Sequence, residues 1–232
     1  MASTVLFVPG SWEGPAVFDQ VRQLLEAKSI PTAAAPLAST GKRSPDAPSL
    51  QEHMAAVRDV ILSHVDAGRE VVLVLHSGGG VADSNAMGDD LPIAKRKELG
   101  LPGGVRKIVA MAAGLFPPGF QHQHMPFEDM LFPVHWAGGF SRQKDNGGMW
   151  CKDAEEALFH DVPDKDKWMP LLQPQPAEGL VGVIKYAGWQ NVPTTYVVAD
   201  KDWVIVHVDA GHMLMLAKPQ EMVDIIAKEA LE

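Results

Sequence analysis

Short runs of apolar, mostly β-branched residues recur along the chain and are separated by segments whose apolar positions repeat every three or four residues. Uninterrupted apolar runs of this length are typical of strands buried on both faces of a parallel sheet. We therefore predict strands at residues 4–8, 30–35, 71–75, 107–112, 194–199 and 204–208.

Helices are predicted between these strands. A first helix is expected over Pro15–Lys28, and a closing helix over Pro219–Leu231 has proline at its first position. The clearest helix follows Ser49, which forms a capping box with Glu52 ahead of an apolar stripe made of Leu50, Met54, Val57, Ile61 and Val65. The alternation of strands and helices predicts an α/β fold with a doubly wound, mostly parallel sheet.

The regular pattern is lost between Leu115 and about Gln190, where Pro, Gly, Trp, Met and His cluster. Short helical pieces are expected at residues 153–159 and 178–189. We expect residues 1–232 to form a single domain, in which residues 115–190 are an inserted, largely helical cap over the carboxyl edge of the sheet.

Composition narrows the classes of protein that fit. The chain has 232 residues, 46% of them hydrophobic and 21% charged, which suits one globular domain. A net charge of −9 disfavours nucleic acid and anionic membranes as partners, because both require basic patches. The single cysteine, Cys151, is compatible with a reducing compartment. The chain has no 18-residue apolar run that would predict a membrane span and no basic leader that would predict a signal peptide, so we expect a cytoplasmic location. The expected partner is a small-molecule substrate, and a homodimer is left open.

The strand at 71–75 ends in His76-Ser77-Gly78-Gly79-Gly80. Glycines remove the steric obstacle to a sharp turn, and a helix starting behind the turn would aim N–H groups at an anion. This favours a nucleophile elbow that exposes the hydroxyl of Ser77. The usual G-x-S-x-G pattern has Leu75 at its first position here, and a plain glycine-rich turn is the alternative. A phosphate-binding loop is disfavoured because neither G-x-G-x-x-G nor a following lysine is present.

A serine nucleophile needs a base and an orienting acid. In doubly wound hydrolases these follow the serine in the order acid, then histidine, at later strand ends. Asp200 or Asp202 is the candidate acid and His212 the candidate base, although the aspartates could be solvated turn residues and His212 could cap a helix. His76 is expected to point inward as a packing residue.

An oxyanion hole needs two backbone N–H groups. We assign them to Gly78, directly after the nucleophile, and to Ser11 in the Pro-Gly-Ser-Trp loop that follows the first strand. A plain turn would also use the Pro-Gly pair.

The cap region carries other residues with chemical potential. His122, His124 and His135 lack the spacing of a zinc site, so no metal and no cofactor are predicted. An apolar substrate pocket is expected from aromatic side chains, which could equally form a small packing core: Trp12, Phe116, Phe127 and Trp136.

Three segments carry a resemblance to a known family: Phe7-Val8-Pro9-Gly10-Ser11-Trp12, Val72–Gly79, and Asp209–Pro219 with its Gly-His-Met-x-Met pattern. On these residues the whole chain resembles the α/β-hydrolase superfamily, in particular its small esterase and hydroxynitrile-lyase-like branch and its uncharacterised fungal or bacterial hydrolases. The resemblance implies Ser77 as nucleophile, His212 as base, Asp200 as acid, and Ser11 and Gly78 as the oxyanion hole.

The chain departs from the family between the last two strands. His212 follows Asp200 by only 12 positions, which is too short for the helix that the family places there. The helix is therefore expected to be missing. Either the last strand runs antiparallel, or the acid is displaced to Asp202 or to a residue elsewhere, or the triad is incomplete.

Three functions fit these residues. The first is a serine hydrolase that cleaves a small, fairly apolar ester or lactone through an acyl-serine intermediate. The second is a hydroxynitrile-lyase-like lyase on the same Ser-His site, normally aided by a cap lysine, for which the chain offers Lys144, Lys152, Lys165 and Lys167. The third is a catalytically impaired hydrolase fold that only binds a ligand.

Overall fold

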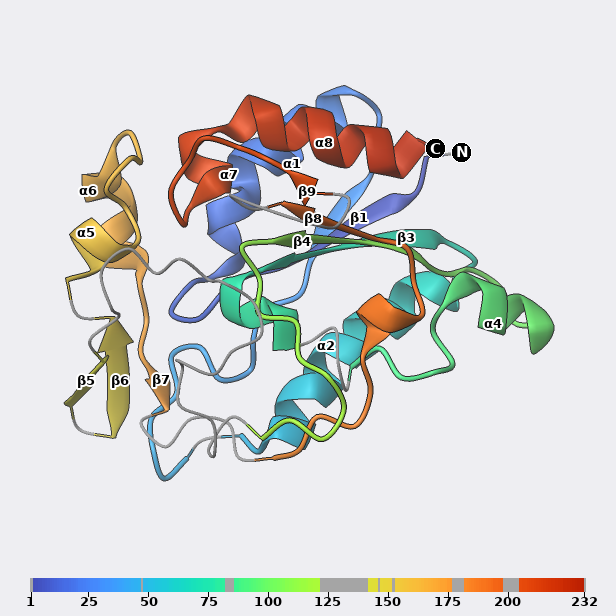
Figure 1. Cartoon of the computed structure of the whole chain (residues 1–232), viewed down its shortest axis with the longest axis horizontal. Coiled ribbons are helices and arrows are strands. Elements are labelled where there is room, and N and C mark those ends of the chain that lie inside the picture. The colour runs from blue at the N-terminus through green and yellow to red at the C-terminus, as the bar shows by residue number, and fades with distance from the viewer. Residues whose placement is uncertain are drawn as a thin grey trace.

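Within the residues that the computed structural model describes, six parallel strands form one central sheet (Figure 1). The described residues are 2–46, 48–81, 86–121, 142–145, 147–151, 153–176, 182–197 and 205–231. The strands lie in the order β2-β1-β3-β4-β8-β9 and comprise β1 (Thr4–Val8), β2 (Thr32–Ala34), β3 (Glu70–His76), β4 (Gly104–Met111), β8 (Thr194–Val197) and β9 (Ile205–Val206). Each predicted strand is therefore present, although β2 and β9 are shorter than predicted.

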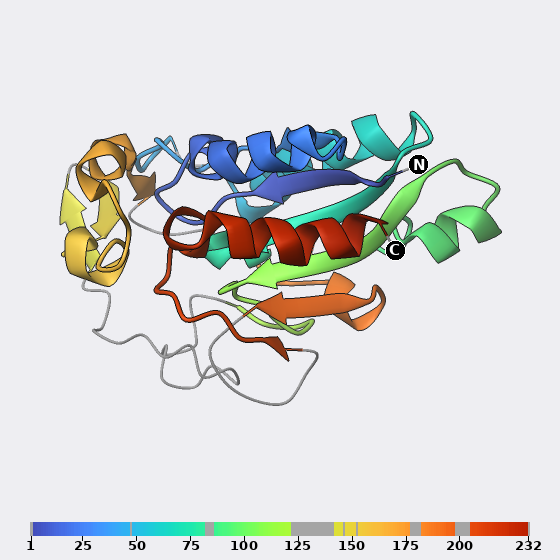
Figure 2. The same ribbon diagram turned by 90° about the horizontal axis from the view of Figure 1, so that it is seen from above.

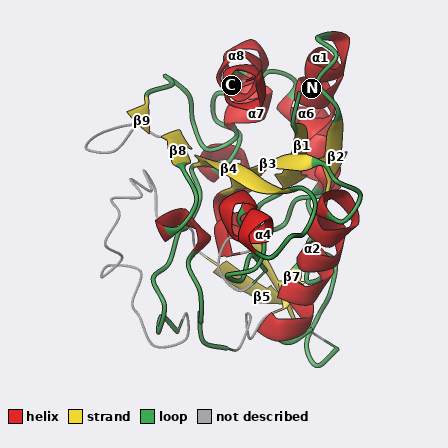
Figure 3. Ribbon diagram, turned by 90° about the vertical axis from the view of Figure 1, so that its right-hand side faces the viewer, coloured by secondary structure: helices red, strands yellow, loops and turns green. Residues whose placement is uncertain are grey.

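The side chains of the central strands pack into two separate cores, because successive side chains point to opposite faces of the sheet. In β1, Val5 and Phe7 belong to one core and Leu6 and Val8 to the other. The first core includes side chains of α1 (Asp19–Ala27) and α8 (Pro219–Leu231), and the second includes those of α2 (Leu50–Val65). Figure 3 shows α1 and α8 on one side of the sheet and α2 and α4 (Ile93–Glu98) on the other. The doubly wound α/β fold is confirmed.

Local sequence signals set the ends of several helices. Ser49 and Glu52 form the predicted capping box, with the Glu52 N–H donating to Ser49 Oγ at 3.2 Å and the Ser49 N–H to Glu52 Oε2 at 2.8 Å. The first predicted helix splits into a 3-10 turn, η1 (Pro15–Phe18), and α1. None of the helices within the described residues combines the length and apolar composition needed to cross a membrane.

The last strand, β9, runs parallel to β8, so the antiparallel alternative is wrong. Ile205 pairs with Tyr196, and Val206 pairs with Val197. Because β9 is only two residues long and lies beside the carboxyl end of β8, the connection has no need to return along the whole sheet. The question of a missing helix falls in residues 198–204, which lie outside the described residues.

The described part of residues 115–190 contains a second, smaller sheet as well as short helices. β5 (Arg142–Asp145), β6 (Gly148–Cys151) and β7 (Gln175–Pro176) form an antiparallel sheet beside α5 (Ala154–Ala157) and α6 (Lys165–Trp168). Figure 2 shows these elements beyond the carboxyl ends of the central strands.

The helix predicted at 178–189 is wrong in its described part, where only a 3-10 turn, η5 (Gly188–Gln190), is present. The backbone of this stretch bonds to a neighbouring loop instead. Ile184 N–H donates to the Phe120 carbonyl at 2.9 Å, and Gly119 N–H donates to the Ile184 carbonyl at 2.7 Å.

Candidate active site

Ser77 occupies a strained corner directly after β3. Its φ of 48° lies in the left-handed region, which costs an L-residue about 1–2 kcal/mol. A 3-10 turn, η2 (Ser77–Val81), starts at this residue, while residues 82–85 of the predicted following helix lie outside the described residues. Such strain in a non-glycine residue is typical of functional sites. Leu75, at the position of the usual first glycine, is fully buried in the core on the α2 side.

The glycines after Ser77 let this corner pack against two neighbouring backbones. A Cβ on Gly79 would lie 2.8 Å from the Val8 carbonyl oxygen, and one on Gly80 would lie 2.9 Å from the Gly114 backbone. The Gly114 N–H also donates to the Ser77 carbonyl at 3.0 Å. Contacts this close leave no room for a side chain, so the turn is wedged between the ends of β1 and β4.

His212 lies against the hydroxyl of Ser77. Its Nε2 is 2.9 Å from Ser77 Oγ, although the two residues are 135 positions apart. His212 reaches this place because it follows β9 and precedes α7 (Leu214–Ala217), which packs in the core with α8. The structure thus brings together the predicted nucleophile and the predicted base, within hydrogen-bond distance.

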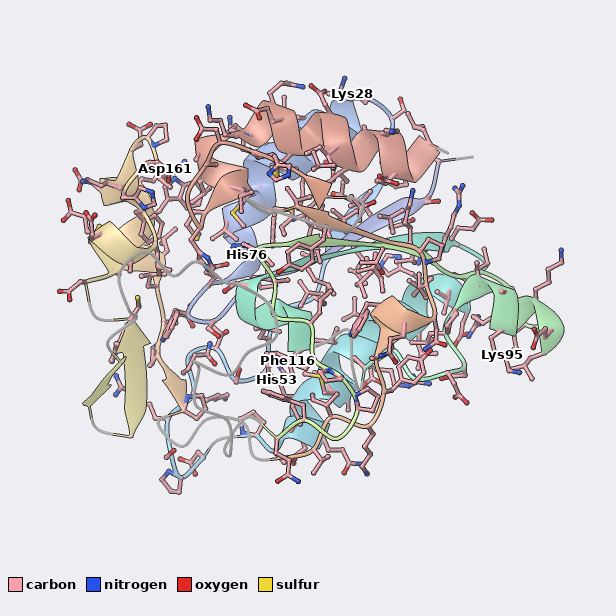
Figure 4. All side chains as sticks on the ribbon, viewed as in Figure 1. Lys28, His53, His76, Lys95, Phe116 and Asp161 are labelled. Atoms are coloured by element: carbon pink, nitrogen blue, oxygen red, sulfur yellow. The ribbon has the colours of Figure 1, made fainter. Side chains whose placement is uncertain are left out.

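A buried carboxylate that the sequence reasoning missed lies behind this pair. Glu13 Oε2 is 3.0 Å from His76 Nδ1, and the other ring nitrogen of His76, Nε2, is 2.9 Å from the His212 carbonyl oxygen. His76 is fully buried and Glu13 is 1% exposed. Figure 4 labels His76 at the carboxyl end of the sheet. The prediction that His76 points inward is confirmed, but its polar contacts were not foreseen.

The surroundings favour the protonated, positive form of His76 and the neutral form of His212. Burial opposes protonation of His76 and is the largest influence, but the charge of Glu13, its hydrogen bond and the His212 carbonyl together raise the pKa of His76. The pKa of His212 is held well below 6.5, first by burial and then by the charge of His76. His212 is therefore the neutral imidazole, able to accept a proton.

The loop after β1 lies against the serine corner. A Cβ on Gly78 would lie 3.1 Å from the Ser11 backbone nitrogen. Ser11 and Gly78 thus stand side by side at the carboxyl ends of β1 and β3, which are adjacent in the sheet. Connections from these two strands lead in opposite directions along the sheet, and such switch points are where open α/β sheets bind ligands.

An aspartate from the 115–190 region contacts Gly211, the residue directly before the predicted base His212. The Gly211 N–H, next to His212, donates to Asp161 Oδ2. A Cβ on Gly211 would lie 2.6 Å from Asp161 Oδ1, so a side chain there would have to push the Asp161 carboxylate aside. Figure 4 places Asp161 among the elements beyond the sheet edge. No local sequence signal marks Asp161 as a partner of residue 211, so this contact is not predictable from the sequence.

Trp12 and Phe116 are both 7% exposed and belong to different cores. Trp12 has a positive φ of 68°, and Phe116 stacks on Phe120 with ring centroids 4.3 Å apart. Both therefore act in packing, and their contact with a substrate stays a prediction. Several further predicted residues lie outside the described residues: Asp200, Asp202, His122, His124, His135, Phe127 and Trp136.

The described residues do not favour a metal or a cap lysine at this site. Glu13, His76 and His212 offer ligand atoms within 4.8 Å of one another, but both nitrogens of His76 already bond to protein acceptors and His212 Nε2 contacts Ser77. Of the cap lysines, Lys165 pairs with Glu155, and the Lys167 amino group lies over the Trp168 ring. Lys152 and the side chain of Lys144 are not among the parts of the chain that the structure describes.

Comparison with known proteins agrees with the fold. A sequence model of the alpha/beta hydrolase family matches residues 5–225. A probable hydrolase from Phoma sp. is 24% identical, with 97% of each chain covered. A solved pyrethroid hydrolase has a TM-score of 0.72 at 18% identity, covering 99% of this chain and 98% of that one. A solved polyneuridine aldehyde esterase variant has a TM-score of 0.70 at 18% identity, covering 99% of this chain and 100% of that one.

Proposed function

Because this chain belongs to the alpha/beta hydrolase family, we propose that it is a serine hydrolase in which Ser77 forms an acyl intermediate. The observation that carries the proposal is the 2.9 Å contact between His212 Nε2 and the hydroxyl of Ser77 at a left-handed corner. A neutral imidazole beside a strained, glycine-flanked serine is the arrangement that nucleophilic acyl transfer requires.

The proposed reaction has two halves. In the first, His212 takes the proton of Ser77 Oγ as that oxygen bonds to the substrate carbonyl carbon, and the proton then passes to the leaving alcohol. In the second, a water molecule gives its proton to His212 and attacks the acyl carbon, which releases the acid and restores Ser77. The N–H groups of Ser11 and Gly78 stabilise the oxyanion, a role worth roughly 10²–10³-fold in kcat for one donor. Asp200 is the proposed orienting acid.

We propose a small, fairly apolar ester or lactone as the substrate, bound under residues 115–190 acting as a cap. The position of β5, β6, β7, α5 and α6 beyond the carboxyl ends of the strands supports that role (Figure 2). The hydrogen bond between Asp161 and Gly211 also joins this region to the residue directly before His212. Among proteins of the same fold, one named an esterase and one named a pyrethroid hydrolase are compatible with ester cleavage.

A fluorophosphonate probe tests the nucleophile directly, because Ser77 Oγ displaces fluoride from phosphorus and remains covalently bound. We expect mass spectrometry to find the label on Ser77 of the wild-type protein. Labelling should be lost in Ser77→Ala and fall by at least about 10³-fold in His212→Ala. His64→Ala, a change on α2, is the control and should label like wild type.

The same experiment separates the alternatives. Labelling at Ser77 together with hydrolysis of short-chain esters supports the hydrolase. Labelling without ester hydrolysis, but with cleavage of a cyanohydrin, would support the lyase. Folded wild-type protein that neither labels nor turns over any of these compounds would overturn the proposal in favour of a binding protein.

A further inference from the structure

We infer that the buried pair Glu13–His76 is a positioning device that holds His212 and the oxyanion loop against Ser77. The inference rests on the proposed hydrolase function and adds two positioning residues to it. Neither residue contacts the reacting atoms, so both act through the groups they hold.

His212 is held at two points by His76 and Ser77, two consecutive residues at the carboxyl end of β3. His76 Nε2 lies 2.9 Å from the backbone carbonyl of His212, and Ser77 Oγ lies 2.9 Å from its ring Nε2. A single contact leaves the ring free to pivot, whereas two contacts at opposite ends of the residue define both its place and its orientation. A misplacement of about 1 Å in such a site costs on the order of 10²-fold in rate.

The carboxylate of Glu13 contacts both His76 and the oxyanion loop. Glu13 Oε2 accepts hydrogen bonds from His76 Nδ1 and from the Gly10 N–H, each at 3.0 Å. Gly10 directly precedes Ser11, the proposed oxyanion donor. One buried carboxylate therefore connects the oxyanion loop to His76, which in turn contacts the base His212 and directly precedes the nucleophile Ser77.

The hydrogen-bond partners of His76 determine its charge. A carboxylate and a carbonyl oxygen can only accept hydrogen bonds, so both ring nitrogens of His76 must donate and the ring is an imidazolium. Of the described contacts of this ring, the titratable ones come from Glu13 and His212, while Phe18 meets it edge-on with centroids 6.4 Å apart. The positive ring lies 4.9 Å from the ring of His212, between centroids, and disfavours a second positive charge there.

Stability alone does not account for such a pair. Burying two charges loses their hydration, and apolar residues of similar volume often give equal or greater stability in the same place. What apolar residues lack is a donor to the His212 carbonyl and an acceptor for the Gly10 N–H. The specific contribution of the pair is therefore to orient these two groups.

Two substitutions of His76 separate its contacts. In His76→Gln the side-chain amide can reach the place of Nε2 and still donate to the His212 carbonyl. In His76→Asn the shorter amide replaces Nδ1 and reaches only Glu13. We expect kcat for ester hydrolysis to fall on the order of 10²-fold in the asparagine variant, but by no more than about tenfold in the glutamine variant. KM should change by less than about threefold in both variants.

Glu13→Gln provides a readout that a merely structural role would not move. Without the carboxylate, buried His76 loses its positive charge, and the pKa of His212 is released upward toward 6.5. The acid limb of kcat/KM should therefore shift to higher pH in Glu13→Gln and in both His76 variants. His53→Gln removes another buried histidine, on α2, and should leave both kcat and the acid limb unchanged.

The outcomes are distinguishable from failure of the hydrolase proposal itself, which would appear as wild-type protein without labelling or turnover. If wild type is active but the glutamine and asparagine variants lose equal activity, the orienting role is wrong. If folded Glu13→Gln keeps the wild-type kcat and acid limb, the positioning role of the pair is refuted. Urea unfolding of every variant establishes that folded proteins are compared. If a His76 variant does not fold, the near-isosteric Glu13→Gln variant still tests the proposal.

Discussion

Replacing Gly10 by alanine tests how tightly the oxyanion loop is packed against the serine corner. A Cβ on Gly10 would lie 2.7 Å from Ser77 Cβ, 3.1 Å from His76 Nδ1 and 3.2 Å from Glu13 Oε1. Ordinary contact begins at 3.4 Å, so the loop must retreat from Ser77 by about 0.7 Å, the difference between 3.4 Å and 2.7 Å. The flanking Ser11 N–H moves with it.

Two magnitudes follow from this displacement. Overpacking of a tight site costs about 1–3 kcal/mol. At about 2–4 °C per kcal/mol for a chain of this size, Tm should fall by roughly 2–12 °C. A displacement near 1 Å in an active site costs about 10²-fold, so kcat should fall by close to that factor while KM changes little.

The matched control is Gly14→Ala in the same loop. A Cβ on Gly14 meets nothing within 4 Å, and its φ of −99° is open to alanine. We expect its kcat within about twofold of wild type and its stability within about 0.5 kcal/mol. Steady-state hydrolysis of a chromogenic ester and calorimetry measure both quantities. A Gly10→Ala protein with the kcat and Tm of the control would refute the close packing described here.

Gly211→Ala should lower kcat by up to about tenfold, because its Cβ would displace the Asp161 carboxylate and break the hydrogen bond beside His212; steady-state kinetics on folded protein checks this. Full activity in this variant would show that the contact is dispensable. The acid limb of kcat/KM should lie below pH 6.5, because activity falls only as pH drops through the depressed pKa of His212; a midpoint at or above 6.5 would contradict the assignment. Ser49→Ala should lose about 1 kcal/mol of unfolding free energy in urea through its cap, whereas Ser63→Ala, exposed on the same helix, should change it by less than about 0.5 kcal/mol.

Local sequence patterns were enough to predict the sheet and most of its helices. A strand such as Val71–Leu75 packs against cores on both faces of the sheet, which is why its sequence is an uninterrupted apolar run. Helix α2 likewise begins where its capping box predicts. The Ser77 corner could also be found, because a strand that ends in His-Ser-Gly-Gly-Gly is itself a local signal.

The contacts of the candidate site were decided by tertiary structure. Glu13 reads in the sequence as an ordinary polar loop residue, and it becomes a buried partner of His76 only because β1 pairs with β3 in parallel and their carboxyl ends coincide. The Asp161 contact and the small sheet near residues 142–176 were missed for the same reason. Periodicity along the chain indicates which face of an element a residue occupies. The identity of its neighbour depends on distant segments, 63 residues away for Glu13 and His76 and 50 residues away for Asp161 and Gly211.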